Sequence, residues 1–321
     1  MLHRSDFCVL LAGAALLAHG STTARGADAA TASAVAPESA PARTFSPADR
    51  ILILSPHPDD ETLCCGSLIR RAVQAGAWVG VVWVTSGDAF ELDAVVVQHR
   101  IVPGRTAMRR LAQRRMDEAV AATTVLGIDR THLYFLGFPD RGIKRLLTDH
   151  YYSAYTSRYT GAAAVPYEQA YQPGEPYRGE NLEHAIDTIL DATQPTLVLA
   201  PTPLDRHPDH SAVGELTIRV MARRHQGDRV SYWIVHGGRD WPTPHRLRLE
   251  SPLMPPKLAA GLKWLSLAVS SAERTTKLLA LRQYHSQWEV MEPFLASFVR
   301  SNELYSVTPF PDDIEAPLLE E

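Results

Sequence analysis

The chain has 321 residues, of which 45% are hydrophobic and 21% charged, a composition typical of a globular protein with a substantial core. Its 32 lysines and arginines against 36 aspartates and glutamates give a net charge of −4, which argues against nucleic acid as the main partner. The apolar content excludes a chain that is disordered throughout, and three cysteines are too few for a disulfide framework.

The first 20 residues have the order of a secretory signal. His3 and Arg4 precede an uninterrupted apolar run at 8–18, and small residues follow it. We therefore expect residues 1–20 to be a signal peptide and the protein to be exported, either to a periplasm or as a secreted protein. The apolar run is too short to cross a bilayer core of about 30 Å, and no later segment is longer, so we expect no membrane span.

Residues 21–46 are rich in Ala, Thr, Ser, Pro and Gly and have no helical or strand periodicity. This composition predicts a flexible linker before one folded domain at 47–321. After cleavage of the signal, the only cysteines are Cys64 and Cys65. A disulfide between neighbours closes a strained ring, so we expect two small buried thiols instead.

The domain alternates apolar strands with amphipathic helices. The pattern predicts strands at 50–55, 78–85, 131–136, 196–200 and 230–236, and helices at 59–75, 106–127, 181–193 and 211–224. Such alternation is typical of a Rossmann-like, doubly wound α/β fold, in which helices flank a mostly parallel sheet on both faces. Ligands of such sheets bind outside the carboxyl ends of the strands.

Two His-Pro-Asp clusters follow predicted strands at this edge. The first is PHPDDE at 56–61, and the second is DRHPDHS at 205–211. One such turn is often no more than a helix N-cap, since Asp caps helices and Pro suits turns. Two of them, each after a strand, are hard to explain by capping and predict a functional site. A dinucleotide binder would instead need a Gly-x-Gly-x-x-Gly turn after the first strand.

The residue types in the two clusters are those of a catalytic metal site. Zinc binds imidazole nitrogen and carboxylate oxygen, and a catalytic site keeps three protein ligands and an open position. His57 and Asp60 are three residues apart at a helix start and can face one centre, and His210 can supply a third ligand. We expect one zinc ion per chain, although iron and cobalt also suit two imidazoles and one carboxylate.

The other members of the clusters are candidates for proton transfer. Asp59 lies beside the expected ligands and is placed to act as general base. His207 can face the developing oxyanion or the leaving group. Asp209 can hold His207 in one tautomer, as carboxylates behind catalytic or ligating histidines do.

The paired turns resemble those of the PIG-L/LmbE-like deacetylases, which are zinc-dependent enzymes that remove acetyl groups from N-acetylglucosamine conjugates. Other segments are similar to further motifs of that family, and together they span residues 50–287: TSGD at 85–88, RMDEA at 115–119 followed by Leu-Gly at 126–127, FLGFPD at 135–140, and Lys277 with YHSQ at 284–287, which the resemblance assigns to the last helix.

The resemblance implies roles for individual residues. His57, Asp60 and His210 would be the zinc ligands and Asp59 the base, and His207 would be the acid or oxyanion partner with Asp209 behind it. Arg115 and Asp140 match positions that family members use to hold the sugar or its attached group, and Asp88 in the TSGD loop is a further candidate for substrate binding. Two of them have simpler interpretations: Arg115 as part of a solvated basic helix face, and Asp140 as a turn aspartate after a proline.

Two enlarged loops distinguish the domain from small members of that family. Seven of the eleven tyrosines lie in the first, at 150–177, where they either form a saccharide-binding wall or anchor the loop. The second loop, at 236–256, begins with His236, which either contacts the substrate or is an ordinary strand-end histidine. The two loops favour a substrate larger than a small thiol precursor, namely an N-acetylated oligosaccharide, glycan or glycoconjugate.

The sequence therefore predicts an exported zinc-dependent deacetylase that releases acetate from an N-acetylglucosamine-type sugar. Two alternatives stay open. A zinc amidase for a non-sugar amide would use the same site chemistry. A non-catalytic glycan-binding protein would have no need of Asp59.

Overall fold

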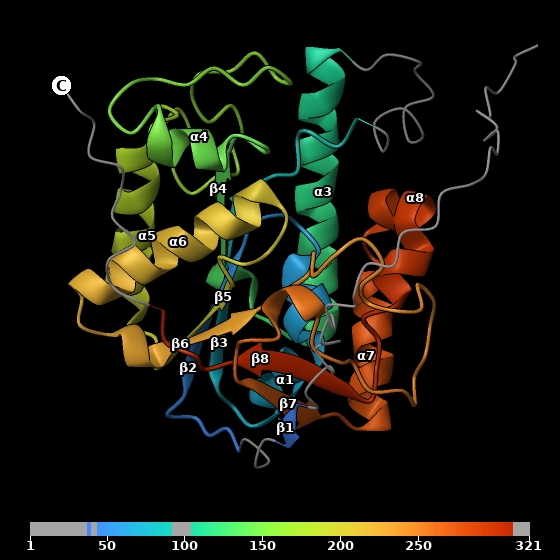
Figure 1. Ribbon diagram of the computed structural model, residues 1–321. Helices are drawn as coiled ribbons and strands as arrows, with labels where there is room; N and C mark the ends of the chain where they lie inside the picture. Colours follow the sequence, from blue (N-terminus) through green and yellow to red (C-terminus); the bar gives the residue numbers. More distant parts are fainter. Residues whose placement is uncertain (1–36, 40–43, 92–103, 311–321) are drawn as a thin grey trace, which may run out of the picture. The chain divides into compact units, whose positions relative to one another are not determined.

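Eight strands form one sheet in the order β1-β7-β8-β6-β5-β2-β3-β4 (Figure 1). The computed structural model describes residues 37–39, 44–91 and 104–310. The strands are β1 (Glu38–Ser39), β2 (Arg50–Ser55), β3 (Trp78–Thr85), β4 (Leu133–Phe138), β5 (Leu197–Pro201), β6 (Val230–Trp233), β7 (Trp264–Ala268) and β8 (Asn302–Ser306). The five predicted strands are β2 to β6, and they pair in parallel.

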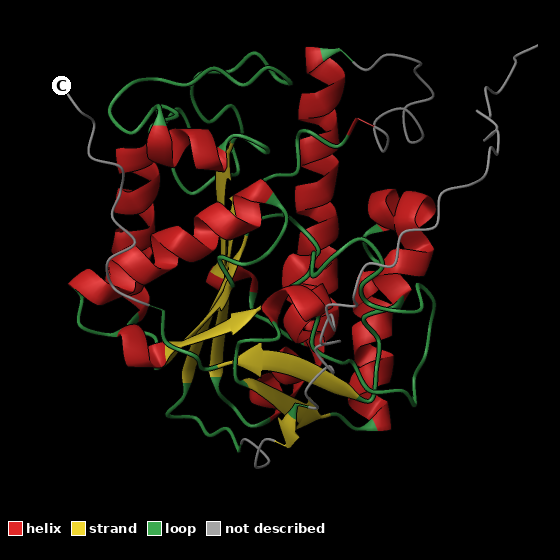
Figure 2. Cartoon of the chain, viewed as in Figure 1, coloured by secondary structure: helices red, strands yellow, loops and turns green. Residues whose placement is uncertain are grey.

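Helices cover both faces of this sheet (Figure 2). They are α1 (Asp60–Gln74), α3 (Arg105–Leu126), α4 (Ile143–Thr148), α5 (Gly179–Thr193), α6 (Pro208–Arg223), α7 (Ser271–Leu281) and α8 (His285–Ala296). One group of contacting helices consists of α1, α3, α7 and α8, and a second group consists of α4, α5 and α6. The doubly wound, mostly parallel α/β fold expected from the sequence is thus confirmed. Because both faces of the sheet are covered, the central strand β2 is almost continuously apolar and buried.

The neighbouring strands β2 and β5 bring the two His-Pro-Asp turns together. They pair in parallel from Ile51 with Leu197 to Ile53 with Leu199, so their carboxyl ends lie at one edge of the sheet. Helix α6 starts directly from the second turn and packs closely on the end of β5. A Cβ atom at Gly214 would lie 2.6 Å from the Pro201 carbonyl oxygen, so this approach requires glycine.

The structure differs from the expected framework at two points. Glu38–Ser39, within the expected linker, pair in parallel with Leu265 and Ser266 of β7 and extend the sheet. A two-residue edge strand is too short to show a periodicity in the sequence. The expected last helix is two helices, because Tyr284 adopts a non-helical conformation between α7 and α8. The sequence pattern also did not reveal β7 and β8, which join the sheet in an antiparallel pair.

The expectation of two free cysteine thiols is also wrong, because Cys64 and Cys65 form a disulfide in α1. Their Cα atoms are 3.8 Å apart, as chain neighbours must be, and both side chains are buried in the core. Ring strain disfavours a disulfide between chain neighbours, but the two sulfurs are buried and forced to lie close together.

The predicted signal peptide and most of the predicted linker lie outside the described residues, so these two assignments stay predictions. Among the helices in the described part of the chain, none has both the length and the apolar character that crossing a membrane requires.

Candidate active site and metal centre

Backbone hydrogen bonds fix the first His-Pro-Asp turn at the end of β2. Thr85 at the end of β3 donates through its backbone N–H and its hydroxyl to the Pro56 carbonyl oxygen. The Ser55 hydroxyl donates to the His57 carbonyl oxygen at 2.8 Å, and the His57 N–H donates to Asp60 Oδ2 at 2.9 Å. The turn therefore points the His57 and Asp60 side chains toward the second turn.

The three expected metal ligands meet at one point. His57 Nδ1 lies 3.2 Å from Asp60 Oδ2 and 3.2 Å from His210 Nε2, and His210 Nε2 lies 3.1 Å from Asp60 Oδ2. Adjacent ligand atoms around a tetrahedral zinc ion, with bonds of about 2.0–2.1 Å, are separated by about 3.3 Å. The triangle of donor atoms therefore fits the face of such a coordination tetrahedron. We call these three residues the ligand triad.

The carboxylates around the triad also favour binding of a cation. Burial lowers the pKa of His210, but Asp60 and Asp205 raise it to about 9. Burial raises the pKa of Asp60, but His210 and His57 lower it well below its ordinary value. Carboxylates thus favour positive charge at a site lined by buried imidazoles. A divalent cation held by neutral histidines would supply that charge.

The outer nitrogen of each triad histidine faces a carboxylate. His210 Nδ1 lies 3.2 Å from Asp205 Oδ2, and His57 Nε2 lies 3.2 Å from Asp140 Oδ1 and 3.4 Å from Asp209 Oδ2. Such carboxylates fix the tautomer and orientation of a ligating histidine. Asp205 lies within the second motif, but the residue pattern alone does not reveal its role. The one clue to this role in the sequence is that Asp205 lies two residues before the His-Pro-Asp turn. From there its carboxylate can reach back over the start of the helix.

The link from Asp205 to His210 has a measurable consequence. We expect Asp205→Asn to weaken metal affinity about 10- to 100-fold, because an amide oxygen is a poorer partner for the ring N–H of His210. Competition with a chromophoric chelator measures this affinity. The exposed Asp228→Asn is the matched control. Equal affinities of the Asp205 and Asp228 variants would show that Asp205 does not support the ligand.

Asp59 adjoins the triad and is held in an unusual backbone conformation, with φ of 121°. Its N–H donates to Glu61 Oε2 at 3.3 Å. Glu61 is itself fully buried and accepts hydrogen bonds from Trp83 Nε1 at 2.9 Å and from the Tyr284 hydroxyl. Burial raises the pKa of Asp59 well above its ordinary value, and Arg115 opposes that shift. Sequence analysis did not identify Glu61, whose partners come from β3 and from the turn between α7 and α8.

Arg115 is buried beside Asp59 and is not part of a solvated helix face. Its guanidinium donates to the Pro58 carbonyl oxygen at 2.8 Å and lies 3.4 Å from Asp59 Oδ2. It also donates to the carbonyl oxygen of Gly87, which has φ of 68°. A Cβ atom at Gly87 would lie 2.1 Å from the guanidinium, so glycine is needed there.

His207 lines the site, but Asp209 does not support it in the expected way. The Asp209 carboxylate faces His57 and accepts the backbone N–H groups of Arg141 and Ile143 at 2.5 and 3.1 Å. The Asp209 backbone N–H donates instead to His207 Nδ1 at 3.3 Å. This hydrogen bond leaves the proton of a neutral His207 on Nε2. Burial and the neighbouring imidazoles lower the pKa of His207 to about 2, so its ring is neutral.

The structure separates the two aspartates that were expected to contact the sugar. Asp140 lines the pocket and contacts His57. Asp88 is fully buried behind it, accepts the Asp140 N–H at 3.0 Å and the Tyr167 hydroxyl at 2.6 Å, and does not line the pocket. Burial and the Asp140 charge raise the pKa of Asp88 to about 7. Asp88 therefore supports Asp140 and does not line the pocket in which we expected it to contact substrate.

The two enlarged loops have different relations to the site. None of the tyrosines of the 150–177 loop is among the pocket-lining residues. Tyr155, Tyr167 and Tyr177 are buried, and Tyr177 donates to the Gly137 carbonyl oxygen at 3.1 Å. The structure thus favours the anchoring interpretation of this loop. In the second loop His236 lines the pocket, and its ring centroid lies 5.2 Å from that of His207.

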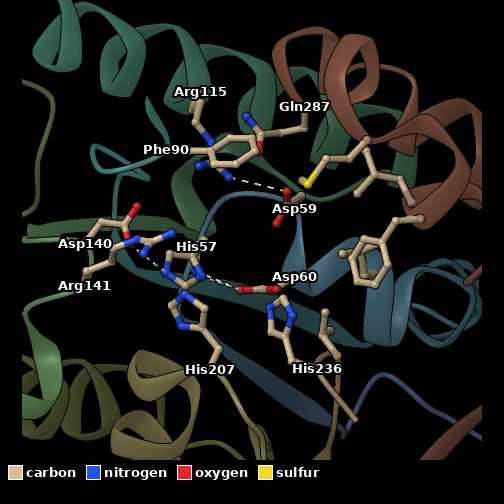
Figure 3. Close-up of a pocket in the computed structure, with 15 residues that line it drawn as sticks. His57, Asp59, Asp60, Phe90, Arg115, Asp140, Arg141, His207, His236 and Gln287 are labelled. Atoms are coloured by element: carbon tan, nitrogen blue, oxygen red, sulfur yellow. Dashed lines mark hydrogen bonds and ion pairs between the residues drawn. The ribbon is translucent and has the colours of Figure 1, made fainter. Parts of the chain in front are cut away.

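These side chains surround one pocket with two unlike sides (Figure 3). Asp140 and Arg141 lie on one side of His57, while Asp60 and His236 lie on the other. Arg115, Phe90 and Gln287 lie beyond Asp59. The rest of the lining is apolar and consists of Leu63, Val235, Met291, Phe294 and Leu295. A buried base, a ligand triad and a neutral imidazole donor facing one pocket are the parts that hydrolysis of an amide or ester requires.

Residues 52–221 match the family model described as PIG-L: GlcNAc-PI de-N-acetylase. The 1D-myo-inositol 2-acetamido-2-deoxy-alpha-D-glucopyranoside deacetylase of Mycobacterium sp. (strain KMS) is 29% identical over 190 residues, which are 58% of this chain and 54% of the relative. The chain thus spans about half the length of the mycobacterial relatives that it matches.

The probable N-acetyl-alpha-D-glucosaminyl L-malate deacetylase 2 of Bacillus anthracis is 25% identical over 257 residues, which are 76% of this chain and 93% of the relative. Among solved structures, the N,N'-diacetylchitobiose deacetylase from Pyrococcus horikoshii has a TM-score of 0.50 at 19% identity, with 81% of this chain and 84% of that chain covered. At this identity the structural likeness bears on the fold alone.

Proposed function

The chain belongs to the PIG-L family, and on this premise we propose that it is a metal-dependent N-deacetylase acting on an N-acetylglucosamine-type sugar, glycan or glycoconjugate. The ligand triad beside the buried Asp59 is the observation that carries this proposal. The relatives named above provide further support, since their names specify acetamido sugars as substrates. Zinc is the proposed ion, because two imidazoles and one carboxylate with an open position form a typical catalytic zinc site.

In the proposed reaction, water and the amide are converted to acetate and a free amino sugar. When bound to His57, Asp60 and His210, a zinc ion would polarise the amide carbonyl and lower the pKa of water. Asp59 takes a proton from the attacking water, and its position between Arg115 and the Glu61 network keeps its carboxylate aimed at the pocket. Burial makes Asp59 a stronger base than an exposed aspartate.

His207 stabilises the oxyanion that forms when the carbonyl is attacked. Its Nε2 carries the proton, because Nδ1 accepts the Asp209 N–H, and its ring lines the pocket. A neutral N–H donor at this point strengthens its hydrogen bond as negative charge develops on the oxygen. Asp59 then returns its proton to the departing nitrogen, so the carbon–nitrogen bond breaks with release of a neutral amine.

The sugar lies, in this proposal, on the side of the pocket formed by Asp140 and Arg141. The Asp140 carboxylate and the Arg141 side chain offer acceptors and donors for hydroxyl groups. Arg115 serves mainly to hold Asp59, since its guanidinium bonds to the turn itself. A zinc amidase for a non-sugar amide would share the triad and Asp59, but it would have no need for polar groups on this side.

A panel of acetylated compounds tests the proposal. We expect the zinc-loaded protein to release acetate from N-acetylglucosamine conjugates or chitooligosaccharides at least about 100-fold faster than from simple N-alkylacetamides. Acetate is measured with a coupled enzyme assay, with a chelated sample as control. Faster release from the simple amides would favour the amidase, and glycan binding without any release would favour a non-catalytic protein.

A further inference from the structure

One side of the pocket is an apolar wall. It consists of Leu63, Val235, Met291, Phe294 and Leu295, all of which line the same pocket as His57 and Asp60 of the ligand triad. Three of the five come from α8, which lies outside the segment that matches the family model. Nothing in the proposed deacetylation uses this wall, because the methyl of an acetyl group is too small to contact all of it.

A break in α8 brings these side chains to the pocket. Met291 has the non-helical φ and ψ of −131° and 23°, and Pro293 lies two residues later. Proline has no N–H to donate to the carbonyl oxygen four residues earlier, and its ring displaces that turn of the helix. Phe294 follows the break and stacks on His236, with ring centroids 6.0 Å apart and an interplanar angle of 12°.

The wall lies on the side of the triad away from Asp140 and Arg141. Figure 3 shows those two residues on one side of His57 and His236 on the other. Because Phe294 stacks on His236, the α8 part of the wall belongs to the His236 side. A substrate amide has two ends, with the sugar on its nitrogen and the acyl substituent on its carbonyl carbon. If the sugar occupies the polar side, the acyl substituent must point toward the wall.

We propose that the apolar wall is a binding site for the acyl chain, and that the enzyme prefers N-acyl groups longer than acetyl. This inference rests on the proposed function: the N-acylated sugar and the hydrolytic site stay the same, and the preferred acyl group becomes longer. The reaction is hydrolysis in both cases: the bond between carbonyl carbon and nitrogen breaks, water supplies one oxygen, and the products are a fatty carboxylate and an amino sugar.

A chain-length series on the wild-type holoenzyme tests this inference. The substrates are N-acetyl-, N-butanoyl- and N-hexanoyl-glucosamine, and the released primary amine is measured with a fluorogenic reagent. Each buried methylene adds about threefold to fourfold in affinity for an apolar site. We therefore expect kcat/KM for the hexanoyl compound to exceed that for the acetyl compound at least about tenfold. Equal or lower values for the longer chains would overturn the inference.

Two variants test whether the wall itself produces the preference. Met291→Gln keeps the side-chain length but makes it polar, and Phe294→Ala shortens the wall. Each should reduce the hexanoyl-to-acetyl ratio of kcat/KM at least about threefold. Leu279→Gln, at an exposed position on α7 away from the pocket, is the matched control and should keep the wild-type ratio. A wild-type ratio in both wall variants would show that the wall does not select the chain.

A separate comparison distinguishes the acyl chain from an apolar aglycone. Methyl and octyl glycosides of N-acetylglucosamine differ only at the sugar's anomeric end. If kcat/KM is higher for the octyl than for the methyl glycoside but does not rise with acyl-chain length, the wall binds the aglycone and our proposal is overturned. If none of these compounds releases amine, the proposed function itself fails. Hydrolysis of the acetyl compound without a chain-length preference would instead overturn only the acyl-chain inference.

Discussion

Asp59→Asn is expected to lower kcat by about 10²- to 10⁴-fold while the protein still binds one metal ion per chain. The loss has this size because a positioned general base typically contributes that much to a hydrolysis. The carboxylate of Asp59 lies beside the ligand triad without belonging to it, and burial raises its pKa toward the range of an effective base. An amide side chain has no basic oxygen of comparable strength.

Asparagine is the appropriate replacement for structural reasons. Residue 59 has a positive φ of 121°, which asparagine and aspartate tolerate better than other side chains except glycine. The N–H that donates to Glu61 is unchanged by the substitution. Turnover is measured by acetate release and bound metal by elemental analysis, with the exposed Asp117→Asn as matched control. Wild-type turnover by the Asp59 variant would remove this residue from the role of base.

Loss of a triad ligand should differ from loss of Asp59, because both bound metal and activity should be lost. We expect His210→Gln to weaken metal affinity by more than the about 100-fold that loss of an outer carboxylate costs. His210 is fully buried, and its Nε2 lies within 3.2 Å of both other donor atoms, so no neighbouring group can move into its place without repacking. Activity should fall in proportion to occupancy and recover in part at high zinc concentration.

The control for this variant is His184→Gln, an exposed histidine on α5. Thermal unfolding of each variant without metal separates a folding defect from a binding defect. Full metal affinity in a folded His210→Gln protein would show that the cluster does not bind its ion through this residue. Asp60→Asn should behave as His210→Gln does, since both side chains belong to the same triangle of donor atoms.

The sequence was sufficient to predict the fold and the meeting of His57, Asp60 and His210 for a common reason. Strand–helix alternation reveals a parallel sheet, and the topology of such a sheet brings the ends of β2 and β5 to one edge. His57 and His210 then meet although 153 residues separate them in the chain. Strong local signals, an apolar strand followed by a His-Pro-Asp turn, define both halves of the site.

The sequence was insufficient where a role depends on tertiary contacts. Asp88 and Asp140 lie in similar loops, and only the packing of Tyr167 shows that Asp88 is the buried support and not a pocket residue. The sequence predicts that Asp209 holds His207 in one tautomer, but the start of α6 turns the Asp209 carboxylate toward His57. The apolar wall depends on a break in α8, a helix whose pattern gave no indication that it reaches the pocket.

The most direct test of this account is a zinc titration of the metal-free protein, followed by acetate release from an N-acetylglucosamine conjugate. We expect activity to be absent at the start, to rise linearly with added zinc, and to reach its plateau at one equivalent per chain. The same titration of His210→Gln should show no plateau of activity at one equivalent of zinc. Full acetate release by the chelated wild-type protein, or zinc binding that leaves it inactive toward every acetylated sugar, would contradict the central claim.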